Sequence, residues 1–384
     1  MFVEAALKIF IFCHDSYMSG ANKSLYDWTM SDPEDDFIFC FPHYVMKNPF
    51  LNLQKSKIYY GNFFTLNKNL TCISTLNFIK KVTKLCYMKL FKRVLKRRLK
   101  LIIEKEKPDL ILSNSFSLLF GAEIAYELNI PHFWHIREFM ELDHQISHYD
   151  DVLVTKLTHY SNAIYISDVI AEYYESKYKF KNSIVIYNQI HIPEFFNNNK
   201  ELFTNGIIRI MIAGTLQENK GQKEAIKSVE FVHDKGFSVY LDIYGDGPQK
   251  KELNEYIQSK NLGNFIHLKG YSSKINSLRG NYDIELVCST NEALGRVTVE
   301  SMGCGCITIG ADAGCTSKII SESNGLLYKL HDVKDLARKI IYAYENVEKM
   351  KSIRRNARKF SVENFSRPIY KQIQHFFTIC DVKK

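Results

Sequence analysis

The chain has 384 residues, which is too long for one typical hydrophobic core, so two domains are expected. Hydrophobic residues make up 46% of the chain and charged residues 24%, a balance that excludes an intrinsically disordered protein. The net charge of +9 comes from 51 Lys and Arg against 42 Asp and Glu, and it predicts attraction to an anionic partner.

The cysteines and the first residues indicate an intracellular protein. The nine cysteines form no CxxC pair, and Cys304 and Cys306 are too close together for the usual zinc spacing, so we expect reduced thiols. The first run, MFVEAALKIFIFC, contains Glu4 and Lys8, and therefore predicts a buried strand instead of a signal peptide. No stretch approaches the roughly 20 apolar residues that cross a bilayer.

In chain order, short apolar or β-branched runs alternate with patterns of helical length. We predict a first series of strands at 7–13, 36–41, 109–114, 131–136, 162–167 and 183–188, and a second series at 207–214, 238–245, 264–271, 283–289 and 306–310. These runs are nearly continuous in apolar residues, which is typical of parallel strands buried on both faces. The alternation predicts a doubly wound α/β architecture.

A polar stretch separates the two series and contains Asn-Asn-Asn and Asn-Gly turn signals. We therefore predict an N-terminal Rossmann-like domain at 1–192, a linker at 193–206 and a C-terminal Rossmann-like domain at 207–364. A cleft is expected between the two domains. Residues 365–384 are expected to form a helix that packs back on the N-terminal domain.

Two loops of the N-terminal half carry candidate site residues. The loop after the first strand, CHDSYMSGANKSL, contains Gly20 and Ala21, which permit close approach to the backbone, although such a pair also suits an ordinary turn. After a later strand, HIREF places His135, Arg137 and Glu138 together, where a site wall is expected. Arg137 and Glu138 either contact substrate or form a local ion pair.

The segment at 78–108 is strongly basic, with twelve Lys or Arg and two acids. From residue 88 its side chains separate by helical spacing into an apolar face and a basic face. The apolar face is Met88, Phe91, Leu95, Leu99 and Ile102, and the basic face is Lys89, Arg93, Lys96, Arg97 and Lys100. The helix at 88–103 can bind an anionic membrane surface, pack on the N-terminal sheet, or do both. Nucleic acid is not expected as a partner because no aromatic stacking pattern accompanies the charge.

The stretch NEALGRVTVESMGCG follows an apolar strand and predicts a helix that begins near Gly295. A helix N-terminus suits a phosphate, and Arg296 adds a forked cation. Glu292 and Glu300 flank this position, so they can bind the hydroxyls of a sugar and of a ribose. Alternatively, the first acid only favours the helix dipole and the second lies on the surface.

These residues resemble the signature of retaining GT-B glycosyltransferases of family 4, in which two glutamates stand eight positions apart. AGTLQENKGQKEAI, YGDGPQKKEL, HLKGY, SMGCGCITIGADAGCTSKII and SNGLLY resemble further motifs of that family in the same order, over about 120 residues. The match implies a GT-B fold. The chain departs from the family at Thr215, where an arginine is usual, and Arg296 is expected to supply the missing charge beside Lys220.

The resemblance also implies roles for individual residues. His135 and Glu292 are expected to be catalytic. The donor would contact Gly214, Thr215, Lys220, Tyr271, Glu292, Ala293, Leu294, Gly295, Arg296 and Glu300. The acceptor would contact Gly20, Ala21, Arg137 and Glu138. No metal and no cofactor are expected, and a UDP-sugar is favoured as co-substrate.

We therefore expect a glycosyltransferase that moves a sugar from a nucleotide-diphosphate sugar with retention of anomeric configuration. The acceptor is expected to be a glycan or lipid-linked glycan of a bacterial surface polysaccharide such as a capsule. The enzyme would be cytoplasmic, peripheral on the inner face of the cell membrane. Two alternatives are a GT-B-fold nucleotide-sugar epimerase and a non-catalytic accessory subunit of a partner transferase.

Overall fold

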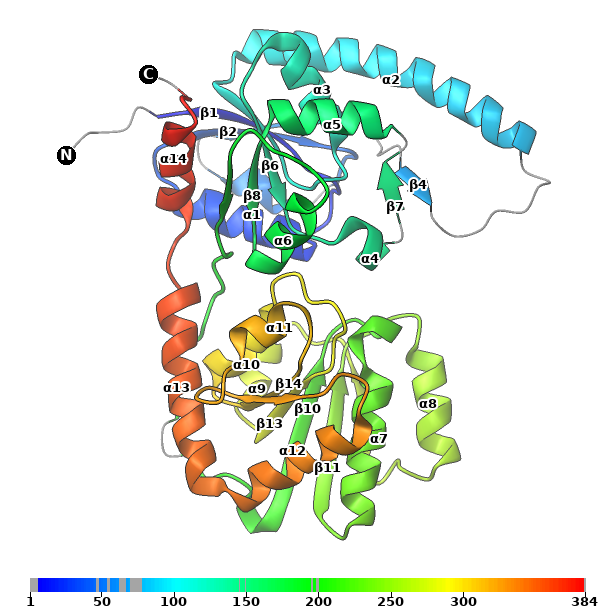
Figure 1. Ribbon diagram of the computed structural model, residues 1–384, viewed down its shortest axis with the longest axis vertical. Coiled ribbons are helices and arrows are strands. Elements are labelled where there is room, and N and C mark those ends of the chain that lie inside the picture. The colour runs from blue at the N-terminus through cyan, green and yellow to red at the C-terminus, as the bar shows by residue number, and fades with distance from the viewer. Residues whose placement is uncertain are drawn as a thin grey trace. The chain divides into compact units, whose positions relative to one another are not determined.

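The computed structural model describes residues 6–382 except 46–47, 54–55, 62–66, 70–77, 145, 149, 195 and 198–199. The chain divides into two compact units: unit 1 is Met1–Gln189 with Pro368–Lys384, and unit 2 is Ile190–Arg367. Each unit is built on its own parallel β-sheet with helices packed on it (Figure 1). Within the described residues, no helix is both long enough and apolar enough to cross a membrane.

The sheet of unit 1 has seven parallel strands in the order β3-β2-β1-β5-β6-β8-β9. Six of them coincide with the predicted first series. The edge strand β3 was not predicted, because its SKIYY sequence lacks a continuous apolar run and its side chains are only half-buried. A separate antiparallel pair, β4 with β7, has three residues in each strand. The bounds are β1 Lys8–Phe12, β2 Asp36–Phe41, β3 Ser56–Tyr60, β4 Asn67–Asn69, β5 Leu110–Ser113, β6 His132–Ile136, β7 Ile146–His148, β8 Asn162–Tyr165 and β9 Ser183–Val185.

Helices cover both faces of this sheet. Because side chains alternate along a strand, β1 sends Ile9 and Ile11 into one core and Phe10 and Phe12 into another. The first core is completed by α1 and α14, and the second by α2 and α3. The helices are α1 Gly20–Ser31, α2 Phe78–Glu106, α3 Leu119–Leu128, α4 Met140–His144, α5 Asp151–Tyr160, α6 Asp168–Glu175 and α14 Tyr370–Ile379, with a 3-10 turn at Pro49–Asn52.

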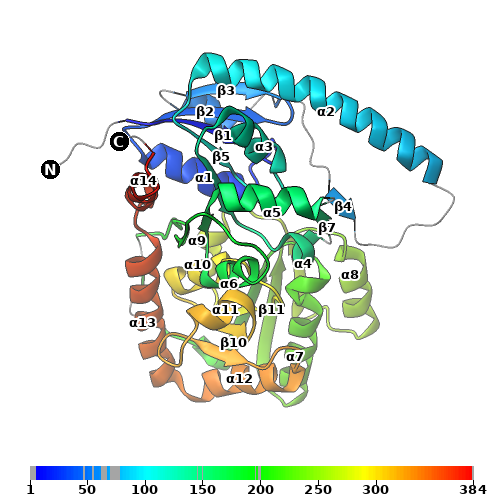
Figure 2. The same ribbon diagram turned by 45° about the horizontal axis from the view of Figure 1, so that its top comes forward.

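The predicted basic helix is part of α2, which runs along unit 1 as one long rod (Figure 2). Leu95 and Leu99 are buried in the core, and Ile102 is half-buried beside it. The apolar face therefore packs inward. The side chains of Met88 and Phe91, which were predicted for the same face, lie outside the described part of the chain.

Part of the predicted basic face is paired with α3. Lys96 Nζ lies 3.0 Å from a carboxylate oxygen of Glu123, and Lys100 Nζ lies 3.2 Å from Glu127. Lys92 also pairs with Glu123. Lys96 and Lys100, which were expected on the basic face, are therefore paired with two acids of the neighbouring helix.

The C-terminal helix α14 belongs to unit 1. Ile373 and Phe377 are buried in the core that α14 shares with α1, and the ring of Phe377 lies 4.7 Å from that of Phe133 on β6. Apolar residues of the C-terminal helix α14 thus cover one face of the sheet that contains the N-terminal strands β1 and β2.

The sheet of unit 2 has six parallel strands in the order β12-β11-β10-β13-β14-β15. The first five in chain order coincide with the predicted second series, whereas the three-residue edge strand β15 was not predicted as a strand. β11 corrects another expectation, because it alternates buried Leu241 and Ile243 with Tyr240, which is 41% exposed, and so has only one buried face. The bounds are β10 Ile207–Ala213, β11 Ser238–Tyr244, β12 Ile266–Gly270, β13 Ile284–Val287, β14 Ile307–Ala311 and β15 Leu326–Tyr328.

Helices α7, α8 and α12 pack on one face of this sheet through a single core, which the start of α13 also joins. On the other side α10 buries Val299 and Met302 and contacts α13. The helices are α7 Gln222–Asp234, α8 Lys250–Ser259, α9 Ile275–Arg279, α10 Arg296–Cys304, α11 Gly314–Ile319, α12 Val333–Glu345 and α13 Val347–Phe365.

The predicted linker at 193–206 is packed within unit 2. Leu202 and Phe203 are buried in the core of this unit, and the guanidinium of Arg354 lies 5.4 Å from the centre of the Phe196 ring. The asparagines gave the segment a polar composition, but its apolar residues hold it against the domain that follows.

Two buried acids join the end of α1 to α14. Asp35 accepts a hydrogen bond of 2.8 Å from the backbone N–H of Leu7, and Gln374 Nε2 lies 3.4 Å from oxygens of both Asp32 and Asp35. Burial raises the pKa of Asp35 to about 6, helped by the neighbouring charge of Asp32 and opposed by the Leu7 hydrogen bond. Its pKa in the unfolded chain is about 3.9.

A carboxyl group with a raised pKa in the folded state stabilises the protein at low pH and loses that contribution as pH rises through the folded pKa. We therefore expect the wild type to lose about 1 kcal/mol of stability from this group between pH 5 and pH 8. Asp35→Asn should remove this part of the pH dependence, as measured by urea unfolding at both pH values. The control is Asp36→Asn, which removes an exposed charge. Equal pH dependence in both variants would contradict the assignment.

Candidate functional site

The predicted site residues fall into two groups, one in each unit. The donor candidates lie in unit 2, where the loops that follow β10 and β13 meet at the carboxyl ends of the strands. The N–H of Thr290 donates to the carbonyl of Asn219 over 2.9 Å, which joins the two loops. Gly221 has φ +68°, and a Cβ there would lie 2.3 Å from the carbonyl oxygen of Cys288. Only glycine permits this close packing of the start of α7 on the end of β13.

Lys220 and Glu292 form an ion pair across these two loops. Lys220 Nζ lies 2.6 Å from Glu292 Oε1, and the two side chains are 28% and 13% exposed. The carbonyl of Glu292 accepts the N–H of Cys315 at 2.8 Å, which fixes the loop from behind. A small cavity of about 60 Å³ lies here, lined by Ile212, Ala213, Gly214, Lys220, Leu286, Val287, Cys288, Ser289, Glu292 and Val297.

The helix that was predicted to begin near Gly295 is α10, which begins at Arg296. Gly295 is its N-cap, with φ +73°, and a Cβ there would lie 2.9 Å from Ile319. The cap has no side chain, so the first N–H groups of the helix remain uncovered by it. The positive end of the helix dipole therefore lies at the loop that carries Glu292.

Glu300 lies on the second turn of α10 and is held by two arginines. Arg296 Nε lies 2.8 Å from Glu300 Oε1, and Arg279 Nη1 lies 3.0 Å from Oε2. Glu300 is 9% exposed, so the alternative of a surface acid is wrong. Arg296 Nη1 is buried and has no hydrogen-bond partner among the described residues.

Sequence reasoning missed Arg279 and Glu285, which form a buried pair beneath Glu300. Arg279 Nε and Nη2 donate to the two carboxylate oxygens of Glu285 over 2.7 and 3.1 Å. Burial disfavours the charged guanidinium, but the charges of Glu285 and Glu300 outweigh it and raise the pKa of Arg279. One signal could have found the pair: Glu285 stands inside the apolar run IELV of β13, and an acid inside a buried strand requires a cationic partner.

The remaining donor candidates differ in what they present. Thr215 is exposed, and its carbonyl accepts from Gln222 Nε2 at 3.0 Å. Tyr271 follows β12 and is 79% exposed, so its ring is free to contact a ligand. Leu294 is buried, which leaves only its backbone for a donor. Gly214 and Ala293 are half-buried.

The acceptor candidates lie in unit 1. Gly20 and Ala21 are the first two residues of α1, behind the N-cap Ser19, whose hydroxyl accepts from the N–H of Asn22. No atom lies within 4 Å of where a Cβ on Gly20 would be, so the start of this helix is open.

His135 is fully buried on β6. Its Nδ1 lies 3.0 Å from Nη2 of Arg137, and arginine only donates, so Nδ1 accepts and Nε2 carries the proton. No partner among the described residues accepts from Nε2. Burial and the charge of Arg137 hold the pKa of His135 well below its usual range, so the imidazole is neutral, with its proton on Nε2.

Arg137 and Glu138 do not form the local ion pair that was one of the two expectations. Arg137 donates to Asn114 at 2.7 Å and to Asn188 at 3.0 Å, while the carboxylate of Glu138 accepts from Ser115. Burial lowers the pKa of Arg137 to about 9. The partner asparagines were missed because single asparagines in loops produce no periodic pattern.

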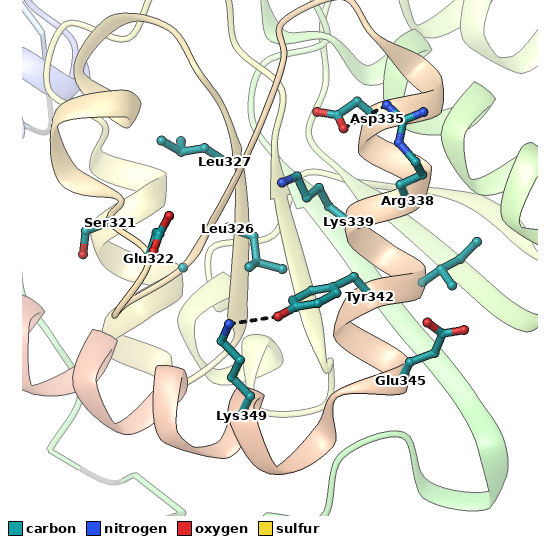
Figure 3. A pocket seen from close by; sticks show the side chains of 12 residues that line it. Ser321, Glu322, Leu326, Leu327, Asp335, Arg338, Lys339, Tyr342, Glu345 and Lys349 are labelled. Atoms are coloured by element: carbon teal, nitrogen blue, oxygen red, sulfur yellow. Dashed lines mark hydrogen bonds and ion pairs between the residues drawn. The ribbon is translucent and has the colours of Figure 1, made fainter.

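A larger pocket of about 750 Å³ lies elsewhere in unit 2, between β15, α12 and α13 (Figure 3). Its lining includes Leu326 and Tyr342, and the hydroxyl of Tyr342 lies 2.9 Å from Lys349 Nζ. It contains none of the predicted donor residues. Its three acids and three basic side chains balance, which favours no charge class of ligand.

Parts of the chain are similar in sequence to known proteins. Residues 194–360 match the family described as glycosyl transferases group 1. Protein CapJ of Staphylococcus aureus is 28% identical over 184 residues, which cover 46% of this chain and 46% of CapJ, so the match spans about half of that relative. A glycosyltransferase of Methanocaldococcus jannaschii is 27% identical over 280 residues, 68% of this chain and 72% of that protein. The N,N'-diacetylbacillosaminyl-diphospho-undecaprenol alpha-1,3-N-acetylgalactosaminyltransferase of Campylobacter jejuni is 27% identical over 208 residues, 50% of this chain and 54% of the enzyme.

Among solved structures, HepE of Anabaena in complex with UDP superposes with a TM-score of 0.76 at 19% identity, covering 97% of this chain and 100% of HepE. At that identity the likeness concerns the fold alone. The fold of this chain is GT-B, as the resemblance implied, and its residues 194–360 are similar to the glycosyl transferases group 1 family.

Proposed function

We propose that this protein is a glycosyltransferase that moves a sugar from a nucleotide-diphosphate sugar to an acceptor with retention of anomeric configuration. The observation that carries the proposal is the arrangement at the start of α10. There, an open helix N-terminus, Lys220 and Arg296 lie with two carboxylates, Glu292 and Glu300, in one loop cluster of unit 2. This combination suits a ligand with a diphosphate between two groups that carry hydroxyls.

In this proposal the ion pair of Lys220 and Glu292 belongs to the ligand-free site. A donor diphosphate would draw Lys220 toward itself, and Glu292 would then accept hydrogen bonds from the hydroxyls of the transferred sugar. Arg296 Nη1, which lacks a partner among the described residues, would bind the same diphosphate and replace the cation that is missing at Thr215. The solved complex of HepE with UDP supports a uridine nucleotide as the first ligand to test.

The proposed chemistry relies on neutralising the leaving group. Two cations and the dipole of α10 would stabilise the charge that develops on the diphosphate, so the reaction would need no metal and no cofactor. His135, neutral and donating from Nε2, would bind a hydroxyl and would not act as a base. Attack would occur on the face from which the diphosphate leaves, with that diphosphate accepting the acceptor's proton.

For the acceptor we propose a lipid-linked glycan of bacterial surface polysaccharide synthesis. The name of the Campylobacter relative, which specifies a diphospho-undecaprenol-linked sugar, supports this class. Gly20, Ala21, Arg137 and Glu138 in unit 1 are the residues proposed to contact it. The epimerase alternative would need a free acid–base pair, whereas both donor-site glutamates are engaged by cations.

We further propose that the enzyme is peripheral on the cytoplasmic face of the membrane, with α2 as its contact. Arg93, Arg97 and Arg98 are exposed, and Val94 and Leu101 on the same helix are 65% and 66% exposed. A surface of this kind presents guanidinium groups to lipid phosphates and apolar side chains to the region beneath them. It replaces the face predicted from spacing, of which Lys96 and Lys100 are paired and Lys89 has no described side chain.

Glu292→Gln should separate binding from turnover. Because Glu292 neutralises Lys220 in the free site, the variant should bind UDP at least as tightly as the wild type in calorimetry. Turnover of the UDP-sugar should fall about 100-fold, since the hydroxyls of the reacting sugar lose a charged hydrogen-bond acceptor. Equal weakening for UDP and for the UDP-sugar would remove Glu292 from the sugar subsite.

A prior thermal-shift screen with UDP, GDP, dTDP and their sugars selects the nucleotide.

Arg296→Ala should lower affinity for UDP by about tenfold or more, as expected for a lost charge-assisted hydrogen bond to phosphate. Affinity for uridine, which has no phosphate, should change less than threefold. This pair of ligands separates the phosphate contact from the contact between Arg296 and Glu300. A loss of less than threefold for UDP would count against compensation for Thr215.

The membrane proposal is tested by two triple variants that remove the same charge. Replacing Arg93, Arg97 and Arg98 by Gln should release the protein from anionic vesicles at low salt. Replacing the paired Lys92, Lys96 and Lys100 by Gln should leave most of the binding intact. Wild-type co-sedimentation should weaken as salt rises, because the Debye length shortens from about 10 Å at 0.1 M to about 3 Å at 1 M. Equal sedimentation of both variants and the wild type at low salt would end the proposal.

A further inference from the structure

Arg279 is a fully buried cation that connects two acids of unit 2. It is the last residue of α9, and its side chain is 1% exposed. We propose that Arg279 is a positioning residue, which orients Glu300 so that its carboxylate binds both ribose hydroxyls of the donor nucleotide. This inference rests on the proposed function and assigns a source for the geometry of its ribose subsite.

The orientation begins with Glu285 on β13. Arg279 donates from Nε and Nη2 to the two oxygens of Glu285, and this forked pair fixes the plane of the guanidinium. The third nitrogen, Nη1, is then directed at Glu300 Oε2, 3.0 Å away. It also donates to the side-chain oxygen of Asn276, one turn back in α9. Because β13 is a central strand of the sheet, Arg279 and Glu285 connect the carboxylate of Glu300 to the core of the domain.

Arg296 alone would hold Glu300 less firmly. Its side chain is 23% exposed and projects from the same helix, four residues earlier. With one arginine on each oxygen, the Glu300 carboxylate cannot rotate without breaking a bond. Each oxygen keeps a second lone pair, so two acceptors remain at a fixed separation. Two adjacent hydroxyls of a ribose present two donors at a matching separation.

The charges support the same division of roles. Glu285 compensates Arg279, so the buried pair is neutral by itself. Glu300 therefore keeps its negative charge for Arg296 and for the ligand. A site built in this way should discriminate against a nucleotide that lacks one hydroxyl, because one fixed acceptor would then be left without a donor.

The experiment compares UDP with 2′-deoxy-UDP by calorimetry on the full chain. Four proteins are measured: the wild type, Glu300→Gln, a double variant Arg279→Met with Glu285→Met, and a control, Arg354→Met. The double variant replaces a buried ion pair by apolar side chains of similar size, so that neither charge remains unpaired. The control removes another buried arginine of unit 2, which donates to the carbonyl of Gly305 and contacts neither Glu300 nor Glu285.

We expect the wild type to prefer UDP by about tenfold or more. The preference should fall below about threefold in Glu300→Gln and in the double variant, because both lose one or both fixed acceptors. The control should keep the wild-type ratio even if its melting temperature falls. A ratio of two affinities is not changed by a loss of stability that affects both ligands equally, so a purely structural role for Arg279 would leave it unmoved.

The outcomes separate this inference from the function on which it rests. If Glu300→Gln loses the preference while the double variant keeps it, the inference is overturned and the ribose role of Glu300 stands. If the wild type binds UDP without preference, both the ribose role and the inference fall, whereas donor binding remains. If neither UDP nor GDP binds the wild type, the proposed function fails. Should the double variant not fold, Arg279→Lys decides: lysine keeps the charge without the fork, so an unchanged ratio overturns the inference and a reduced one supports it.

Discussion

The candidate donor site depends on one constraint, which is that its acids need cations. Glu292, Glu300 and Glu285 have little contact with water, and an unpaired carboxylate in such surroundings would be costly. Lys220, Arg296 and Arg279 meet this need from three different elements, so the pairings also set where the loops after β10 and β13 and the start of α10 lie. Within the candidate site, the three acids and the three cations offset one another's charge.

This self-neutralised state has consequences for a ligand that carries a diphosphate. In the proposed complex Lys220 exchanges the carboxylate of Glu292 for the diphosphate, so the ion pair of Lys220 and Glu292 competes with the ligand. Arg296 has a nitrogen to spare and can keep Glu300 while it binds phosphate. The pair of Arg279 and Glu285 is fully buried, and its forked hydrogen bonds engage both carboxylate oxygens of Glu285. The candidate site thus combines two partly exposed cations, Lys220 and Arg296, with one buried cation, Arg279.

In unit 1, too, buried or half-buried cations are paired, but with different kinds of partner. On α2, Lys92, Lys96 and Lys100 are used to attach the helix to Glu123 and Glu127 of α3, so a large basic count does not mean a large free charge. Arg137 is the opposite case, a buried cation whose partners are neutral amides and an imidazole. The cost of burying it appears as a pKa lowered to about 9, and the same contact fixes the tautomer of His135.

By itself, the sequence determined the architecture and placed the candidate donor site at the start of α10. Strands with continuous apolar runs, such as β1 and β10, were readable because burial on both faces requires such runs, and Gly295 with Arg296 marked the start of α10 because helix ends have local rules. Half-buried edge strands such as β3 and β15 could not be predicted from the sequence, since such strands need fewer apolar residues. The partners of charged side chains could not be predicted either. Arg279 meets Glu300, and Lys96 meets Glu123, only when separate elements pack together. Only the tertiary structure decided which charges are free, because an ion pair depends on distance in space and a composition contains no distances.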